Sequence, residues 1–214
     1  MRGRLITLEG VEGVGKSTVL PVVKNYLTDR GVEVLQTREP GGTELGEQLT
    51  DVLLNTDQEI VPDAELLLMF AARAQHAEKV IEPALKNGQW VLCDRFTDAS
   101  FAYQGGGRQL GAERVGIIEK WVLGDLKADL TLLLDASRET SLERTKKRRE
   151  LDRIETEGDD FFERVRVAYL ERAKTYPDRI KIIDANPEFD TVCASICLQL
   201  EQSCGQWLSA PVDP

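Results

Sequence analysis

The chain has 214 residues, a length that fits one α/β domain able to bury a full core without disulfides. It carries 27 basic and 37 acidic residues, and its net charge of −10 argues against a general nucleic-acid or anionic-membrane surface, because the far field would repel a polyanion. The four cysteines lack zinc-site spacing. No signal peptide or apolar run of about 18 residues stands out, so we expect a cytoplasmic protein without a membrane or nucleic-acid partner.

Short apolar runs alternate with stretches of helical period, which predicts a mostly parallel sheet with helices on both faces. The predicted strands are residues 5–9, 32–37, 90–94, 130–135 and 181–184. The predicted helices are residues 18–30, 44–54, 63–86, 98–103, 112–123, 139–149, 160–176 and 189–203. Pro83 is expected to kink or divide the long third helix. We predict one domain over residues 1–204 and a frayed tail over residues 205–214.

A glycine-rich loop joins the first predicted strand to the first helix. Its backbone N–H groups would converge on an anion at a helix N-terminus, where the helix dipole favours negative charge. Lys16 would reach the β- and γ-phosphates of a nucleotide, and Ser17 would ligate Mg²⁺. A chance glycine-rich turn is the alternative, but strand, loop and helix all match the phosphate-loop pattern. The predicted nucleotide-binding residues are Gly10, Val11, Glu12, Gly13, Val14, Gly15, Lys16, Ser17 and Thr18.

Charged residues also follow other predicted strands, at the edge of a parallel sheet where ligands gather. Arg38 and Glu39 follow the second strand ahead of a Pro-Gly-Gly turn, a segment that a solvated loop would also explain. Asp94 ends the third strand and is suited to hold Mg²⁺, and Glu9 at the end of the first strand is a further candidate ligand. Arg95 offers a planar fork for phosphate oxygens, with a simple Asp-Arg ion pair as the alternative.

Two sets of side chains on predicted helices are candidates to frame an acceptor molecule. Phe70 and Arg73 are three residues apart and suit a flat heterocycle with carbonyl acceptors, although the adjoining leucines also make an ordinary core stripe. The second set shares one helix face and precedes three glycines that we expect to be too flexible for mere packing: Ser100, Tyr103 and Gln104. His76 has no partner in sequence that would make it catalytic, so we expect it at a helix surface or an interface.

A dense basic run from Arg144 to Arg153 stands out in this acidic chain. A solvated helix face is the usual explanation of such a run. Here it lies in a charge-rich stretch before Gly158, as a mobile lid would. Phosphoryl transfer needs cations that arrive over the spreading negative charge and exclude water, so we predict a mobile basic lid over about residues 144–158.

These motifs together resemble the thymidylate kinases, which transfer the γ-phosphoryl group of ATP to dTMP. The similarity extends from residue 5 to about residue 184 and includes the phosphate loop and residues 37–43, 67–73, 94–96, 103–107 and 151–153. The resemblance implies a P-loop NTPase fold, with three α/β/α layers around a five-stranded parallel sheet. It also implies ATP and Mg²⁺ as cofactors and a homodimer formed by helix packing.

The resemblance further implies a site for the dTMP base and sugar. Phe70 would stack on thymine, and Arg73 would hydrogen-bond its carbonyl edge. Ser100 and Gln104 would help to hold the base. Tyr103 would pack near C2′ of the sugar and disfavour a ribose hydroxyl.

Charged residues receive roles from the same resemblance. Arg95 would grip the acceptor monophosphate, and Arg38 belongs to the same substrate-binding set. Glu12 is unusual, because a carboxylate in a phosphate cradle should repel its ligand, and the resemblance implies that it accepts a hydrogen bond from the 3′-hydroxyl of dTMP. The loop resembles the class of this family in which the lid supplies the catalytic basic residue. The expected catalytic residues are Lys16, Arg95, Arg148, Arg149 and Arg153.

Two alternatives remain at the level of sequence. A kinase for another nucleotide or a deoxynucleoside would keep the phosphate loop and change the acceptor pocket. A GTP-dependent switch would be expected to carry Asn-Lys-x-Asp and Asp-x-x-Gly elements, and the sequence contains neither. The switch is therefore the weaker alternative.

Overall fold

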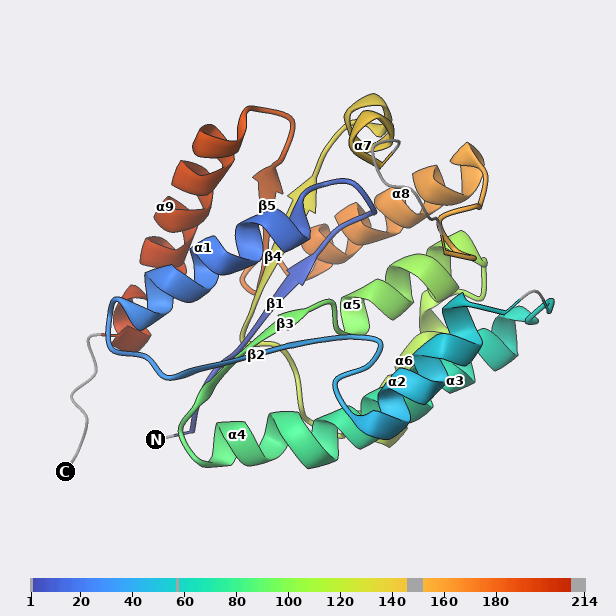
Figure 1. The fold of residues 1–214 in the computed structure, drawn as a ribbon, viewed down its shortest axis with the longest axis horizontal. Helices are drawn as coiled ribbons and strands as arrows, with labels where there is room; N and C mark the ends of the chain where they lie inside the picture. The colour runs from blue at the N-terminus through green and yellow to red at the C-terminus, as the bar shows by residue number, and fades with distance from the viewer. Residues whose placement is uncertain (1, 57, 146–151, 209–214) are drawn as a thin grey trace.

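A five-stranded parallel sheet forms the centre of the computed structural model, which describes residues 2–56, 58–145 and 152–208. The strand order is β2-β3-β1-β4-β5, so β1 lies in the middle of the sheet (Figure 1). The strands are β1 (Leu5–Glu9), β2 (Val34–Arg38), β3 (Trp90–Asp94), β4 (Leu130–Asp135) and β5 (Ile180–Asp184). The predicted bounds of β1, β3 and β4 are confirmed, whereas β2 is shifted toward the C-terminus and β5 begins one residue earlier.

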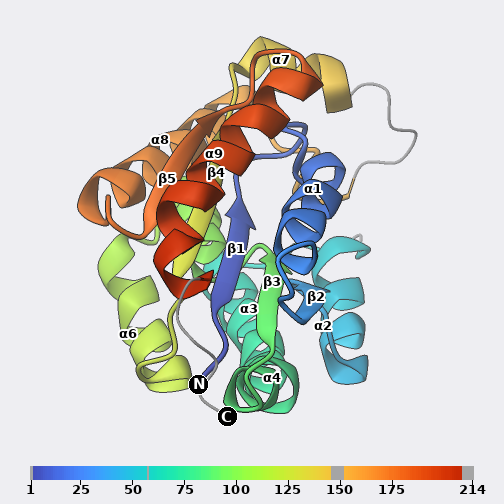
Figure 2. The same cartoon turned by 90° about the vertical axis from the view of Figure 1, so that its left-hand side faces the viewer.

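Helices cover both faces of the sheet and complete the predicted three-layer α/β/α fold (Figures 1 and 2). On one face, α1 and α9 pack against each other, and their apolar side chains share a core with β1 and β4. The remaining helices lie over the opposite face or its edges. The helices are α1 (Lys16–Thr28), α2 (Glu44–Leu54), α3 (Pro62–His76), α4 (Glu82–Lys86), α5 (Thr97–Ser100), α6 (Ala112–Leu123), α7 (Arg138–Thr145), α8 (Asp159–Thr175) and α9 (Phe189–Leu208).

The predicted long third helix is divided into two. Helix α3 ends at His76 and is followed by a π-helical turn, Ala77–Ile81, before α4. Pro83 lies in the first turn of α4, where its missing N–H group cannot continue the regular hydrogen-bond pattern of α3. The division that Pro83 predicted is therefore confirmed, and it falls just before the proline.

Three glycines that we expected to be flexible are packed instead. They lie in a second π-helical segment, Phe101–Gly107, which follows α5 and contacts α8. A Cβ on Gly106 would lie 2.6 Å from Cβ of Ala168, and one on Gly107 would lie 2.6 Å from the ring of Phe161. The expectation of a flexible run is wrong, because Gly106 and Gly107 allow α8 to approach the segment closely.

Helix α9 continues past the predicted domain end at residue 204. Its residue Trp207 meets the ring of Trp90 with centroids 5.9 Å apart, and the Arg4 guanidinium lies 4.7 Å from the Trp207 ring. Residues 205–208 are therefore helical, contrary to the predicted frayed tail, and residues 209–214 lie outside the described part of the chain. Across the described ranges, no helix has the length and apolar character needed to cross a bilayer.

Candidate active site

The phosphate-binding loop connects β1 to α1 at the carboxyl end of the sheet. Gly10, Gly13 and Gly15 all have positive φ, a conformation that side-chain-bearing residues rarely adopt. A Cβ on Gly13 would lie 2.2 Å from the Ser141 carbonyl oxygen in α7. Lys16 is the first residue of α1, so the predicted strand-loop-helix arrangement is confirmed.

The side chain of Lys16 is buried beneath this loop. Its Nζ donates to the carbonyl oxygens of Gly10 and Val11, each at 2.9 Å. Burial, together with the positive charge of Arg95, lowers the pKa of Lys16 to about 7. A bound phosphate would favour the charged ammonium, because a nearby opposite charge stabilises the ionised form.

Glu12 faces away from the phosphate cradle, which explains a carboxylate at this position. Its Oε1 accepts from Nη2 of Arg95 at 2.7 Å, and its Oε2 accepts from the Tyr103 hydroxyl at 2.6 Å. Burial alone would raise the pKa of Glu12, but Arg95 and Lys16 hold it below its usual value. The predicted acceptor residues Glu12, Arg95 and Tyr103 are therefore in direct contact.

Arg95 is held in an unusual backbone conformation immediately after β3. Its φ is 68°, a left-handed value that costs energy for a side chain of this size. Its Nη1 donates to the Gly10 carbonyl at 2.5 Å. Arg95 and Lys16 therefore share one backbone oxygen of the phosphate loop.

A cavity beside the loop collects most of the predicted acceptor residues. These lining residues are Glu12, Arg73, Arg95, Ser100, Tyr103 and Gln104. Arg73 is buried, and its guanidinium donates to Glu39 at 2.6 Å, to the Ser100 hydroxyl at 2.9 Å and to the Phe96 carbonyl at 3.0 Å. The sequence identifies Glu39 only as part of a charged loop, whereas the structure shows that it is the ion-pair partner of Arg73.

The aromatic residue predicted to stack on a base does not line this cavity. Phe70 is 1% exposed and packs in a core with Leu66, Phe101 and Val115. Met69 lines the cavity in its place, four residues before Arg73 and so one turn away on the same helix face. Stacking of a base on Phe70 stays a prediction, and the centroid of its ring lies 4.6 Å from the guanidinium carbon of Arg73, which does line the cavity.

His76 is fully buried, contrary to the expectation of a residue at a helix surface or an interface. Its ring nitrogens lie 3.0 Å from the Glu39 carboxylate and 2.7 Å from the Thr37 hydroxyl. Glu39 thus joins Arg73 and His76 on α3 to the loop that follows β2. Two sequence features indicate this buried group: Arg73 and His76 are three residues apart on one helix, and the carboxylate of Glu39 follows a strand.

A second cavity lies next to the phosphate loop. Ser17, Arg38 and Asp94 line it, and Oδ1 of Asp94 is buried without a hydrogen-bond partner among the described residues. Arg38 points its guanidinium at Glu47, 2.6 Å away, and does not line the acceptor cavity. The structure therefore places Arg38 on the side of Ser17 and Asp94.

Glu9 lies behind the site, not at its surface. Its side chain has no exposed area, and its oxygens accept from Phe96 N at 2.7 Å and from the Tyr169 hydroxyl at 2.8 Å. Both oxygens already have protein partners, so the structure does not support the predicted metal ligand. Burial and the nearby carboxylate of Asp98 raise the pKa of Glu9 to about 7.

We expect Glu9→Gln to stabilise the protein increasingly as pH rises. The folded pKa of about 7 lies above the ordinary value of 4.5, so folded protein binds the extra proton and loses stability between these pH values. Gln keeps both contacts, since its oxygen accepts from Phe96 N and its amide donates to Tyr169. Denaturant unfolding should show the variant gaining roughly 3 kcal/mol over wild type from pH 4.5 to 8. Parallel stability curves would contradict this prediction.

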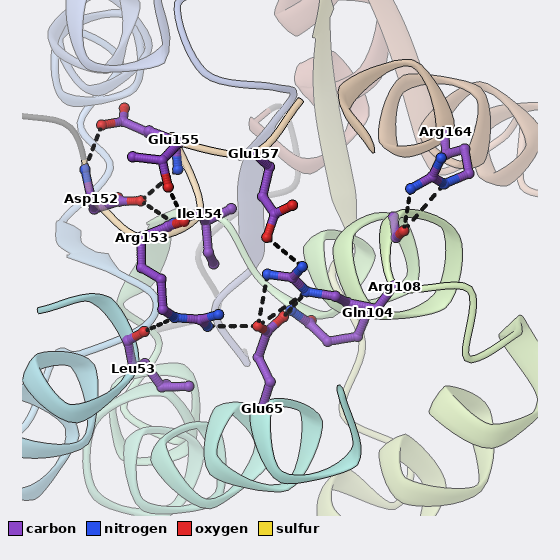
Figure 3. Close-up of polar contacts among 12 residues, drawn as sticks. Leu53, Glu65, Gln104, Arg108, Asp152, Arg153, Ile154, Glu155, Glu157 and Arg164 are labelled. Atoms are coloured by element: carbon purple, nitrogen blue, oxygen red, sulfur yellow. Dashed lines mark hydrogen bonds and ion pairs between the residues drawn. The ribbon is translucent and has the colours of Figure 1, made fainter. Parts of the chain in front are cut away.

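The arginines predicted for the lid have different outcomes. Arg148 and Arg149 lie outside the described residues. Arg153 donates through Nε to the Leu53 carbonyl at 2.8 Å and through Nη2 to Glu65 at 2.6 Å (Figure 3). Its guanidinium is therefore tied to the end of α2 and to α3, and the prediction that it meets the transferred phosphoryl group is not supported.

Arg153→Ala should destabilise the fold, because it removes a partner from a carboxylate that has no exposed area. Arg108 and Gln104 still contact Glu65 in this variant, so we expect the loss of one charged hydrogen bond, about 2 kcal/mol. The control is Arg138→Ala, whose partner Asp159 is 73% exposed, and this variant should lose less than about 1 kcal/mol. Chemical denaturation measures both, and equal losses would show that the Arg153 contact is no stronger than a surface pair.

The geometry indicates an enzyme that moves a phosphoryl group between two bound molecules. The phosphate loop and Lys16 occupy one side, and the partly buried guanidinium of Arg95 occupies the other, together with the polar residues that line the acceptor cavity. One backbone oxygen connects the two sides. The fold and site therefore define a P-loop nucleotide kinase.

Comparison with known proteins specifies the kind of kinase. The family model described as thymidylate kinase matches residues 8–196. Curated thymidylate kinases of Nitrosospira multiformis and Neisseria meningitidis serogroup B are each 54% identical over 196 residues, covering 92% of this chain and 96% and 95% of theirs. The crystal structure of thymidylate kinase from Ehrlichia chaffeensis matches with a TM-score of 0.77 at 30% identity, over 94% of this chain and 99% of that one. The chain belongs to the thymidylate kinase family.

Proposed function

We propose that the site described above transfers the γ-phosphoryl group of ATP to dTMP, giving ADP and dTDP for dTTP synthesis in the cytoplasm. Membership of the thymidylate kinase family supports the reaction. The observation that carries the assignment of residues is the meeting of Lys16 and Arg95 at the Gly10 carbonyl, which puts a donor-side and an acceptor-side cation next to each other. No general base is needed, because a phosphate monoester is largely ionised near neutral pH.

In this proposal the acceptor cavity binds dTMP. Arg95 grips the monophosphate, and Glu12 accepts from the 3′-hydroxyl, which requires the two side chains to exchange part of their mutual hydrogen bonding. Arg73, Ser100 and Gln104 bind the base, and Tyr103 packs near C2′. The shared cavity of these residues supports the proposal.

ATP occupies the loop from Gly10 to Thr18, with Lys16 on its β- and γ-phosphates. Mg²⁺ fits the neighbouring cavity, because the unpartnered Asp94 Oδ1 and the Ser17 hydroxyl are oxygen ligands of the type it prefers. Bound there, the ion would neutralise phosphate charge. The described ranges hold no cluster of three or more His, Cys, Asp or Glu side chains fit for a metal, which suits an ion held partly by substrate phosphates.

We propose that Arg148 and Arg149 supply lid cations for the transition state. The structure describes neither residue, so the proposal rests on the basic composition of the run. Arg153 has the different, anchoring position given above.

We also propose that two copies associate through the outer face of α3 and α6. Three large apolar side chains are exposed there, Leu67 at 55%, Ile117 at 66% and Trp121 at 82%. The two helices are already joined by an ion pair between Asp63 and Arg114 and by an apolar core beneath. Exposed apolar side chains on adjoining helices are typical of association surfaces.

Mg²⁺-dependent ADP release from ATP tests the function, with dTMP compared against dUMP, UMP, CMP, AMP, GMP and thymidine. We expect strong preference for dTMP. Preference for another acceptor would keep the phosphate-loop mechanism and overturn the base assignment. The absence of acceptor-stimulated turnover would overturn the proposed site as a whole.

A further inference from the structure

One buried carboxylate connects the acceptor cavity to the C-terminal part of the predicted lid, at Arg153. Glu65 on α3 has no exposed area and accepts hydrogen bonds from Gln104, Arg108 and Arg153 (Figure 3). The closest of these contacts are 2.9 Å to Nε2 of Gln104 and 2.6 Å to Nη2 of Arg153. Three segments far apart in sequence therefore meet at a single side chain.

The ionised state of Glu65 fixes which end of the Gln104 amide faces it. Its donors, with Gln104 and Arg153 foremost, hold the pKa of Glu65 below its ordinary value despite burial. An ionised carboxylate only accepts hydrogen bonds, so the Gln104 amide must turn its NH₂ group toward Glu65. The carbonyl oxygen is then the group that Gln104 offers to the acceptor cavity it lines.

A carbonyl oxygen in the cavity discriminates between pyrimidines. Thymine and uracil carry an N–H donor at N3, which this oxygen can accept. Cytosine has a lone pair and no proton at N3. Its N3 and the Gln104 carbonyl oxygen would therefore face each other as two acceptors without a donor. A site built to pair one hydrogen-bonding pattern rejects the other strongly, because its polar groups are left unpaired.

Glu65 also holds one wall of the same cavity. Asp152 and Ile154 both line it, and they flank Arg153 in the chain. The Arg153 side chain is fixed between Glu65 and the Leu53 carbonyl, so the backbone of these neighbours is held against the cavity. Glu65 therefore fixes both the orientation of the Gln104 amide and the position of one wall of the acceptor cavity.

We propose that Glu65 is a positioning residue for acceptor selection, which orients the Gln104 amide so that the site accepts an imide base such as thymine and rejects cytosine. This inference rests on the proposed function, in which Gln104 contacts the base. Glu65 is not among the residues that line the acceptor cavity.

Glu65→Gln tests the proposal, with dTMP and dCMP as acceptors and kcat/KM as the measured quantity. A neutral amide at residue 65 can donate to Gln104, which allows the Gln104 amide to reverse. We expect the dTMP:dCMP ratio of kcat/KM to fall at least about tenfold, with the KM for ATP unchanged. Equal loss with both acceptors would show a purely structural role and overturn the proposal.

Arg108→Gln is the matched control. It removes a charged partner of Glu65 and leaves the contact between Glu65 and Gln104 in place, and Arg108 does not line the acceptor cavity. We expect a lower Tm and an unchanged acceptor ratio. A ratio that falls as far in this control as in Glu65→Gln would also overturn the proposal.

Gln104→Leu keeps the proposal testable if Glu65→Gln does not fold. Leucine removes the carbonyl oxygen, so kcat/KM for dTMP should fall by roughly 10- to 100-fold while dCMP changes little. An unchanged dTMP:dCMP ratio would contradict the proposed role. Failure of the wild-type protein to phosphorylate dTMP would overturn the proposed function instead, so the two failures are distinguishable.

Discussion

Lys16→Ala should lower kcat by about 10²- to 10⁴-fold, because it removes the cation that neutralises the transferred phosphoryl group. The fold should persist. Lys16 is buried and its pKa is lowered to about 7, which means that the charged side chain costs free energy in the folded state. Steady-state ADP release gives kcat, and thermal unfolding should give a Tm close to that of the wild type.

Lys86→Ala provides the comparison for this experiment. Lys86 pairs with Glu82 on the surface of α4, is 72% exposed and is not among the residues that line either cavity. Its removal should leave kcat unchanged. A wild-type rate for Lys16→Ala would eliminate the proposed donor site.

Arg95→Ala should reduce kcat/KM for dTMP by about 10²- to 10⁴-fold and change the KM for ATP much less. The guanidinium is the planar fork proposed to bind the acceptor phosphate, and its loss leaves Glu12 without its direct ion-pair partner there. Kinetics with each substrate varied in turn separate the two effects.

Arg95→Lys distinguishes geometry from charge. Lysine restores a positive charge without the bidentate fork, so we expect only partial recovery of kcat/KM. Full recovery would show that any cation suffices. A similar rise in KM for both substrates would argue against a role confined to the acceptor.

Much of the fold followed from local patterns in the sequence. Strands β1, β3 and β4 are buried on both faces, so their continuous apolar runs gave correct bounds. The phosphate loop was predicted because its glycines and Lys16 act through backbone geometry of consecutive residues. Strand β2 is only partly buried and was shifted, since its apolar pattern is weaker.

The features that the sequence did not predict are contacts between distant segments. Arg153 reads as one more cation of a basic run, because its partners Leu53 and Glu65 are far away in sequence. His76 reads as an unpaired surface residue for the same reason, with Glu39 after another strand. Phe70 and Met69 are equally apolar, and only the packing of α3 decides which one faces the cavity.

The carbonyl oxygen of Gly10 reduces the entropy that must be lost before the reaction. Because Lys16 and Arg95 both donate to it, the spacing between the cations proposed for the two substrates is set by the folded loop before either nucleotide binds. Substrates placed by such a preset pair react at a high effective molarity, since little rotational and translational freedom remains to be lost. A Cβ on Gly10 would lie 2.4 Å from the Leu134 carbonyl oxygen, so any side chain there would displace both cations at once.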